Sequence, residues 1–347
     1  MAVRHLRTRS RERSYRVVLA DIAELLRQEG NVALADRIIR DMLVNTNYLR
    51  DEGLDIAELK LLNTAFRELR HALKVFSRFR SIPKAAVFGS SRVKREDPNY
   101  RLAVEFGRLL AKKGWMVITG GASGIMEAAM VGAGARRSFG LNILLPFEQD
   151  ANPIIRGSRQ LMYFKYFFTR KLMFLKESEA TVLFPGGFGT FDEGYESFTL
   201  VQTGKAKPRP LVLVDHRGST FWNSFLSLMR ENMEFGGLID RGDLDLMRHF
   251  QDASQAVEEI TGFYKNYHSS RFLRDQFLVR VRKKLSPRHF DEMNKLFRDM
   301  LERGRFRRLK AIEDEDEKDK RLDRIIFHFD RSSYHALRRL VDWLNGL

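Results

Sequence analysis

The sequence predicts an α/β fold: a Rossmann-like, doubly wound and mainly parallel sheet, with helical N- and C-terminal extensions. Two observations support this prediction. Between residues 82 and 262, short apolar runs rich in β-branched residues alternate with helical stretches, the pattern of right-handed βαβ units with parallel strands. The runs are also apolar throughout instead of alternating with polar residues, as expected for strands covered on both faces.

The expected elements follow one another regularly along this central region. Strands are expected in KAAVFG, WMVITG, LNILLP, ATVLF and PLVLVD, with a sixth near Met247. Helices are expected over 100–113, 124–135, 160–177, a stretch ending at 201, 221–233 and 254–260. The alternation of the two sets makes residues 81–262 one doubly wound domain.

The two flanking regions have a different, helical pattern. Residues 15–80 carry apolar positions at spacings of three and four, the spacing of one helix face. These positions are Val18, Ile22, Leu25, Leu26, Leu59, Leu62, Phe66, Leu69 and Leu73. After residue 262 the chain is basic and is interrupted by the acidic run EDEDEKDK, which we expect to be solvated loop. We therefore expect basic helical extensions at 1–80 and 263–347.

Composition limits the classes of function. The formal net charge of +16 favours anionic partners such as nucleotides, nucleic acid or acidic surfaces. No apolar run approaches the roughly 20 residues of a membrane span, so no membrane partner is expected. The chain has no cysteine and no histidine spacing typical of metal sites, so we expect no disulfide, metal or cofactor. The Arg-rich start would also suit a transit peptide, but a cytoplasmic location is the simpler expectation.

Glycine-rich loops follow several of the expected strands, where ligands bind in open α/β sheets. They are FGSSR, with Ser90 and Ser91; TGGASGIMEA, with Gly120, Gly121, Gly124 and Glu127; and PGGFGTFDE, with Gly186, Gly187, Gly189, Thr190 and Glu193. Glycines let the backbone approach a phosphate, and a following helix N-terminus favours negative charge. The loops therefore predict a nucleotide-phosphate site. Neither G-x-G-x-x-G nor a P-loop is present, which argues against hydride transfer and NTP hydrolysis.

Two of the candidate groups also have structural interpretations. Thr190 and Glu193 match a T-x-x-E capping box, in which Glu193 would only close the helix start. Arg170 and Lys171 would ordinarily be a solvated pair on a helix surface. Their neighbours Phe167, Phe168 and Leu172 are apolar, however, so the pair could instead emerge from a buried helix next to the ligand.

At these motifs the sequence resembles the LOG family of cytokinin-activating phosphoribohydrolases, often labelled lysine decarboxylases. The family signature P-G-G-x-G-T-x-x-E is matched from Pro185 to Glu193, and its R-K element by Arg170 and Lys171. Its earlier glycine-rich loop is matched at Gly120, Gly121, Gly124, Met126 and Glu127, with Ala122 where many members carry a further glycine. The resemblance covers residues 82–262, and the extra terminal regions suggest a long bacterial form.

The resemblance implies hydrolysis of a nucleoside 5′-monophosphate, AMP or N6-modified AMP, to free base and ribose 5-phosphate. It implies that Glu193 stabilises an oxocarbenium-like ribose and activates water, while Arg170 complements charge on the leaving base. The remaining site residues would hold phosphate and ribose, and the family implies a homodimer or higher homo-oligomer. A Schiff-base lysine is not expected, because Lys171 belongs to the R-K element. The alternative is a non-catalytic protein that binds nucleotides, or nucleic acid through its basic ends.

Overall fold

The computed structural model describes residues 17, 20, 22, 34–145, 150–310 and 319–347. The chain divides into two compact units, Met1–Phe66 and Arg67–Leu347. The first contains α2 (Leu34–Tyr48) and the start of α3 (Ile56–Phe76), which continues into the second. Helices over the N-terminal region are thus confirmed where it is described, whereas Val18, Leu25 and Leu26 lie outside the described residues.

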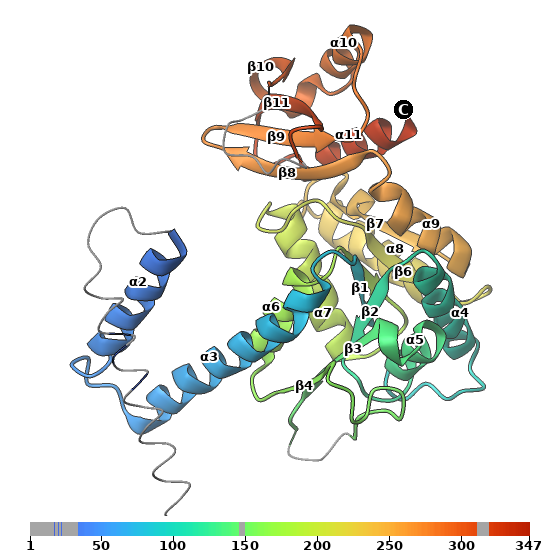
Figure 1. Cartoon of the computed structure of the whole chain (residues 1–347). Helices are drawn as coiled ribbons and strands as arrows, with labels where there is room; N and C mark the ends of the chain where they lie inside the picture. Colours follow the sequence, from blue (N-terminus) through green and yellow to red (C-terminus); the bar gives the residue numbers. More distant parts are fainter. Residues whose placement is uncertain (1–16, 18–19, 21, 23–33, 146–149, 311–318) are drawn as a thin grey trace, which may run out of the picture. The chain divides into compact units, whose positions relative to one another are not determined.

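The second unit is built on a parallel sheet that contains seven strands of the described chain, in the order β4-β3-β2-β1-β5-β6-β7 (Figure 1). The strands are β1 (Lys84–Phe88), β2 (Met116–Thr119), β3 (Ser138–Ile143), β4 (Leu161–Phe164), β5 (Ala180–Leu183), β6 (Leu211–Val214) and β7 (Met247–Phe250). Every residue of β1, β2, β3, β5 and β6 is buried. The predicted doubly wound α/β fold is therefore confirmed.

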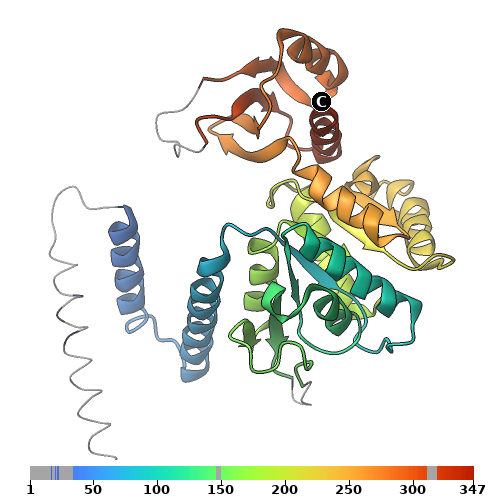
Figure 2. The ribbon, with the colours of Figure 1, turned by 45° about the vertical axis from the view of Figure 1, so that its right-hand side comes forward.

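Helices cover both faces of this sheet (Figures 1 and 2). One face packs on α4 (Pro98–Lys112), α5 (Ile125–Ala133) and α9 (Ala253–Phe263). The other face packs on the end of α3 and on α6 (Phe167–Lys176), α7 (Phe188–Gln202) and α8 (Phe221–Met229). Capping carboxylates fix two of the starts: Asp97 accepts from the Asn99 amide before α4, and Asp252 from the Ser254 amide before α9.

The strand order has a switch point between β1 and β5. From β1 the chain adds β2, β3 and β4 on one side and then returns to pair β5 with the opposite edge of β1. The two strands pair in parallel, with Phe88 opposite Leu183. In open α/β sheets, the loops that leave such a pair of strands diverge and leave a crevice for a ligand. The loops leaving β1 and β5 are FGSSR and PGGFG.

One predicted element of this domain is wrong. The expected helix over 160–177 contains a strand, β4, before α6 begins at Phe167. β4 is a four-residue edge strand in which only Met162 and Phe164 are buried. The alternation of buried and exposed residues in β4 is short, and the apolar spacing of α6 follows it closely. The sequence pattern alone therefore did not separate the strand from the helix.

The C-terminal region is only partly helical (Figure 2). Helices α10 (Pro287–Leu296) and α11 (Tyr334–Gly346) are present, as expected. The remainder was wrongly assigned, because four strands of the described residues form an antiparallel sheet in the order β10-β11-β9-β8. They are β8 (Tyr267–Leu273), β9 (Gln276–Val281), β10 (Leu301–Arg308) and β11 (Asp323–Phe329).

The C-terminal strands were not predicted because the sequence does not signal the hairpin between β8 and β9. Its turn is made by Arg274 and Asp275, and Arg274 has a positive φ of 56°. Such turns usually carry Asn-Gly or Asp-Gly, so the sequence offers no turn signal here. The dense arginines then gave both strands the appearance of an amphipathic helix.

Candidate active site

The three loops at the carboxyl edge of the sheet interlock through their backbones. The Ser90 amide donates to the Pro185 carbonyl (3.1 Å), and the Ile125 amide donates to the Ser90 carbonyl (3.0 Å). Gly124 starts α5 with a φ of +67°, and a Cβ there would lie 2.3 Å from the Ser90 oxygen. Gly186 is as crowded, since its Cβ would lie 2.1 Å from the Thr190 hydroxyl. These two glycines therefore serve loop packing.

A cavity of about 520 Å³ lies among these loops, a size typical of small-molecule sites. Its lining combines glycine backbone, two serines, a few apolar side chains and the charged pair Arg170 and Glu193. The lining residues are Phe88, Gly89, Ser90, Ser91, Arg92, Gly120, Ala122, Met126, Asn142, Ile143, Arg170, Phe174, Gly187, Phe188, Gly189, Thr190 and Glu193. Eight of the predicted site residues thus surround one cavity: Ser90, Ser91, Gly120, Arg170, Gly187, Gly189, Thr190 and Glu193.

The N-terminus of α7 opens into this cavity without a side-chain cap. Gly187 is the N-cap residue, and no side chain of the described residues caps the start of the helix. Within the described parts of the chain, a Cβ on Gly187 or on Gly189 would meet no atom within 4 Å, so packing there does not require these two glycines. Free amides at the positive end of a helix dipole form an anion site.

The capping-box interpretation of Thr190 and Glu193 is wrong. α7 begins at Phe188, so Thr190 is already inside the helix and is not its N-cap. Glu193 has a different partner: its Oε1 accepts from Arg170 Nη2 at 3.3 Å. The carboxylate is therefore free of any role in closing the helix start.

Glu193 and Arg170 form a buried ion pair at the cavity wall. Glu193 is only 4% exposed, and burial raises the pKa of its carboxyl, opposed by the charges of Lys171 and Arg170. Burial likewise lowers the pKa of Arg170, against the charge of Glu193. The Arg170 guanidinium lies over the Phe167 ring (4.9 Å), and its Nε has no hydrogen-bond partner in the described part of the chain. A solvated pair on a helix surface is thus excluded.

Lys171 lies behind Glu193 and does not line the cavity. Its Nζ lies 2.9 Å from Asp192 Oδ2, 3.0 Å from Glu196 Oε2 and 3.5 Å from Glu193 Oε2. Burial alone would lower the pKa of Lys171, but the bonds and charges of these three carboxylates together raise it. This placement suits a residue that holds Glu193 in position; the predicted contact with substrate remains a prediction.

Four other predicted residues stand back from the cavity. Glu127 accepts hydrogen bonds from Arg95 Nη2 (2.6 Å) and Tyr100 Oη (3.3 Å), so its carboxylate already has protein partners. Gly121, with a φ of +73°, shapes the loop after β2, and Gly124 and Gly186 pack the loops together. The predicted ribose contact of Glu127 is not supported by its position.

Asn142 is a cavity residue that the sequence analysis missed. It lies near the end of β3, is 3% exposed and lines the cavity. Its Nδ2 has no hydrogen-bond partner among the described residues. A signal was available, because Asn142 is a polar residue inside the apolar run FGLNILLP, at the edge of the sheet where ligands bind.

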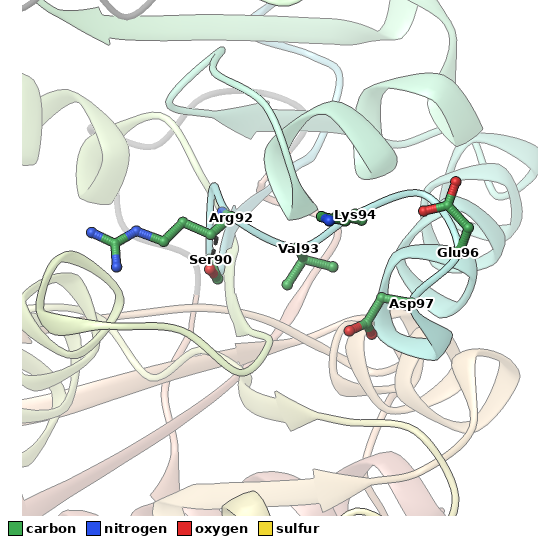
Figure 3. A pocket seen from close by; sticks show the side chains of 6 residues that line it. All are labelled: Ser90, Arg92, Val93, Lys94, Glu96 and Asp97. Carbon is green, nitrogen blue, oxygen red and sulfur yellow. Dashed lines mark hydrogen bonds between the residues drawn. The ribbon is translucent and has the colours of Figure 1, made fainter.

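An open hollow of about 530 Å³ adjoins the cavity and shares Ser90 and Arg92 with it (Figure 3). Arg92 extends away from Glu96 and Asp97 in this view, so the charged groups do not converge on one point. Across the described ranges, no group of three or more Asp, Glu or His side chains is placed to hold a metal ion. No helix among the described residues has the length and apolarity needed to cross a membrane.

The strand order and the position of the cavity define a Rossmann-like α/β protein with a cavity at the switch point of its sheet. Residues 123–260 match a family model described as "Possible lysine decarboxylase". Through this domain the chain is therefore similar to the LOG family, and the resemblance recognised from the motifs is confirmed.

Two curated proteins illustrate the distance to known relatives. An uncharacterized protein of Archaeoglobus fulgidus is 31% identical over 28% of this chain and 63% of its own length. The cytokinin riboside 5′-monophosphate phosphoribohydrolase of Mycobacterium tuberculosis is 27% identical over 41% of this chain and 71% of its own length. The chain thus spans less than two thirds of the first relative.

The solved structures that are similar to this chain cover about half of it. The molybdenum cofactor binding protein of Rippkaea orientalis is 18% identical and covers 52% of this chain and 96% of its own, with a TM-score of 0.38. At this low similarity, the ligand and activity of that protein give no information about those of this chain.

Proposed function

We propose that this protein hydrolyses the N-glycosidic bond of a nucleoside 5′-monophosphate, giving free base and ribose 5-phosphate. The proposal depends chiefly on one observation: a buried carboxylate, Glu193, lines a cavity into which an uncapped helix N-terminus opens. The family match and the phosphoribohydrolase relative support the same reaction.

The 5′-phosphate binds at the N-terminus of α7. The amides near Gly187 and Gly189 are uncapped, and neither glycine carries a side chain that would keep an anion away. The helix dipole adds a stabilisation of about 0.3–1 kcal/mol for a negative charge at such a terminus. Ser90 and Ser91, on the facing loop, offer hydroxyl groups to the same cavity.

Glu193 is then placed to act on the ribose. It follows Gly189 by four residues, so the two share a helix face and are about 6 Å apart along the axis. A phosphate at the helix end thus leaves the sugar near the carboxylate. As the C1′–N bond breaks, the ribose gains oxocarbenium character, which a carboxylate in a desolvated site stabilises strongly.

Water is the second reactant and supplies the new hydroxyl group at C1′. Water adds to C1′ and loses one proton to Glu193, while the base leaves with the electron pair of the C1′–N bond and takes up a proton from solvent. Glu193 then returns its proton to solvent. Arg170, held against Glu193 at 3.3 Å, supplies positive charge for the negative charge that develops on the base. A general base positioned in this way contributes about 10²–10⁴-fold to a rate.

The experiment is to incubate purified protein with a panel of nucleoside 5′-monophosphates, including AMP and an N6-modified AMP, and to follow free base by chromatography. The matching nucleosides without phosphate serve as controls and should give little base. Release from at least one monophosphate, lost in Glu193→Gln, is the expected result. A folded wild-type protein that releases no base from any nucleotide would overturn the proposal.

A second candidate is a protein that binds nucleic acid without turnover. The motivating observation is the edge strand β10, where Arg305 and Arg307 are exposed next to the basic Lys310. Arginines on an edge strand also prevent sheets from pairing, which needs no ligand. Binding of single-stranded nucleic acid that weakens steeply with salt would favour this candidate, and no binding at low salt would exclude it.

A further inference from the structure

Asn142 carries an unexplained polar group in the wall of the cavity. The residue is 3% exposed, and its Nδ2 has no partner within the described part of the chain. A buried amide left without a hydrogen bond costs about 1–3 kcal/mol, so such groups ordinarily have one. A ligand in the cavity that Asn142 lines would supply that bond.

A second asparagine in the same part of the fold shows the ordinary outcome. Asn152 is also 3% exposed, but its Nδ2 donates to the carbonyls of Gly121 (3.1 Å) and Ala122 (3.0 Å). Asn152 therefore holds the loop after β2 in place and has no donor to spare. The contrast indicates that Asn142 does not serve the packing of its own strand.

The strand order places Asn142 at the end of the cavity away from the phosphate loop. β3 is separated from β5 by β2 and β1, and three strand spacings amount to roughly 14 Å. Gly140 pairs with Thr119, the last residue of β2, so Asn142, two residues further along β3, lies at the carboxyl edge of the sheet. A nucleotide with its phosphate at α7 and its ribose near Glu193 therefore extends its base toward β3.

The surroundings of Asn142 suit a base. Ala122, Met126 and Ile143 also line the cavity; Ile143 is next to Asn142 in β3, and Ala122 is in the loop that follows the neighbouring strand β2. Small-molecule sites use this combination, in which apolar surface contacts a ring and one polar group fixes its orientation.

Building on the proposed function, we propose that Asn142 contacts the base and is a specificity-determining residue of this site. Its amide offers one donor and one acceptor to the base edge, so it favours bases that present the complementary pair. An aspartate at this position would offer acceptors only. It would retain bases with an exocyclic amino group and repel those with an oxo group there.

The test measures binding by calorimetry, so that it does not depend on turnover. Glu193→Gln, which is expected not to turn substrate over, is titrated alone and combined with Asn142→Leu or Asn142→Asp, in each case with AMP, IMP and ribose 5-phosphate. We expect Asn142→Leu to weaken nucleotide binding by about tenfold, the loss of one hydrogen bond, and to leave ribose 5-phosphate binding unchanged. We expect Asn142→Asp to raise the preference for AMP over IMP relative to Asn142→Leu.

A matched control is Asn152→Leu, which disturbs the loop and should weaken all three ligands together. Equal losses for nucleotides and ribose 5-phosphate in the Asn142 variants, or no loss at all, would overturn the inference. A wild-type protein that binds nucleotides but releases no base would refute the proposed reaction. The role of Asn142 would then be decided by the measured affinities alone. A wild-type protein that binds no nucleotide would overturn both.

Discussion

The two edges of the parallel sheet use buried charge in different ways. At the amino edge, Lys84 and Arg209 are buried and Glu179 is partly buried, and all three side chains are bonded to backbone. The Lys84 amide donates to Glu179 Oε2 (2.6 Å), Lys84 Nζ donates to the Ile82 carbonyl (2.8 Å), and Arg209 Nη1 donates to the Leu175 carbonyl (2.9 Å). These bonds tie together the segments that enter β1, β5 and β6.

At the carboxyl edge the buried polar groups are only partly satisfied. Asn142 Nδ2 and Arg170 Nε lack partners in the described residues, and both residues line the cavity. The amino edge has one comparable atom, Arg209 Nε, but the rest of that guanidinium is bonded. Burial alone therefore does not mark a functional group in this fold; the distinguishing feature is an unsatisfied polar group next to a cavity.

The largest expected effect separates two glutamates, one at each edge: Glu193 is buried and Glu179 is partly buried. Burial raises the pKa of both Glu193 and Glu179. Glu193→Gln should lower the rate of base release by about 10³-fold, because the general base is lost. Glu179→Gln should lower stability without changing the rate per folded molecule. Rate measurements on both variants, with folded fractions from circular dichroism, make the comparison; equal rate losses would contradict it.

The next effect concerns stability at the amino edge. Arg209→Met leaves the Leu175 carbonyl and the Ser178 hydroxyl without their donor, at a cost of about 3 kcal/mol in the free energy of unfolding. Urea denaturation measures this cost, and nucleotide affinity of the folded variant should be unchanged. An Arg209→Met protein as stable as wild type would show that the amino edge is not held in this way.

The pH dependence of turnover extends the comparison to ionisation. Because burial raises the pKa of Glu193, its carboxylate takes up a proton at a higher pH than an ordinary glutamate, whose pKa is about 4.3. Turnover should therefore fall on acidification with a midpoint above that value. For stability the sign is opposite: a raised pKa contributes stability below the unfolded pKa, which is lost as pH rises through the folded one.

The rate profile of wild type, compared with that of Glu179→Gln, shows whether the midpoint belongs to Glu193. The midpoint should be the same in both proteins. A midpoint at or below about 4.3 in wild type would mean that the carboxylate that acts is a solvated one.

The smallest expected effect is on ligand affinity. Gly187→Ala adds a methyl group that meets no protein atom and needs no unusual φ, so stability should be unchanged. The methyl would occupy space beside the helix amides and should weaken ribose 5-phosphate binding by about tenfold, equivalent to about 1.4 kcal/mol. Gly262→Ala, which also meets no atom within 4 Å, is the control and should bind as wild type does. Equal affinities in both variants would place the phosphate elsewhere.

Most of the central domain could be predicted because its signals are local. The apolar strands and the glycine loops stand next to each other in the sequence, and they predicted both the sheet and the edge at which the cavity lies. β4 could not be separated from α6, because four residues of an edge strand carry too little pattern. The C-terminal strands were missed for lack of a turn signal at Arg274.

The motifs of the site could be predicted from the sequence. Which of their side chains face the cavity and which are bonded to other residues could not. Glu193 and Arg170 follow from the motifs, and the structure pairs them. Glu127 belongs to a motif as well, yet Arg95 and Tyr100 occupy its carboxylate. Both partners approach through tertiary structure from the loop and helix after β1, which no local pattern reveals. Asn142 belongs to no motif. It could have been identified only as a polar residue inside an otherwise apolar strand.

The glycines of PGGFGT fall into two groups on which selection would act differently. Gly186 is crowded by its own fold, so a library randomised there should lose most variants in any screen for expression or thermal resistance. Gly187 and Gly189 face open space, so variants there should pass such a screen and disappear only when growth depends on the ligand. Within one short motif, Gly186 would thus be selected for folding, and Gly187 and Gly189 for ligand binding. Deep mutational scanning, once for expression and once for ligand-dependent growth, would separate the two.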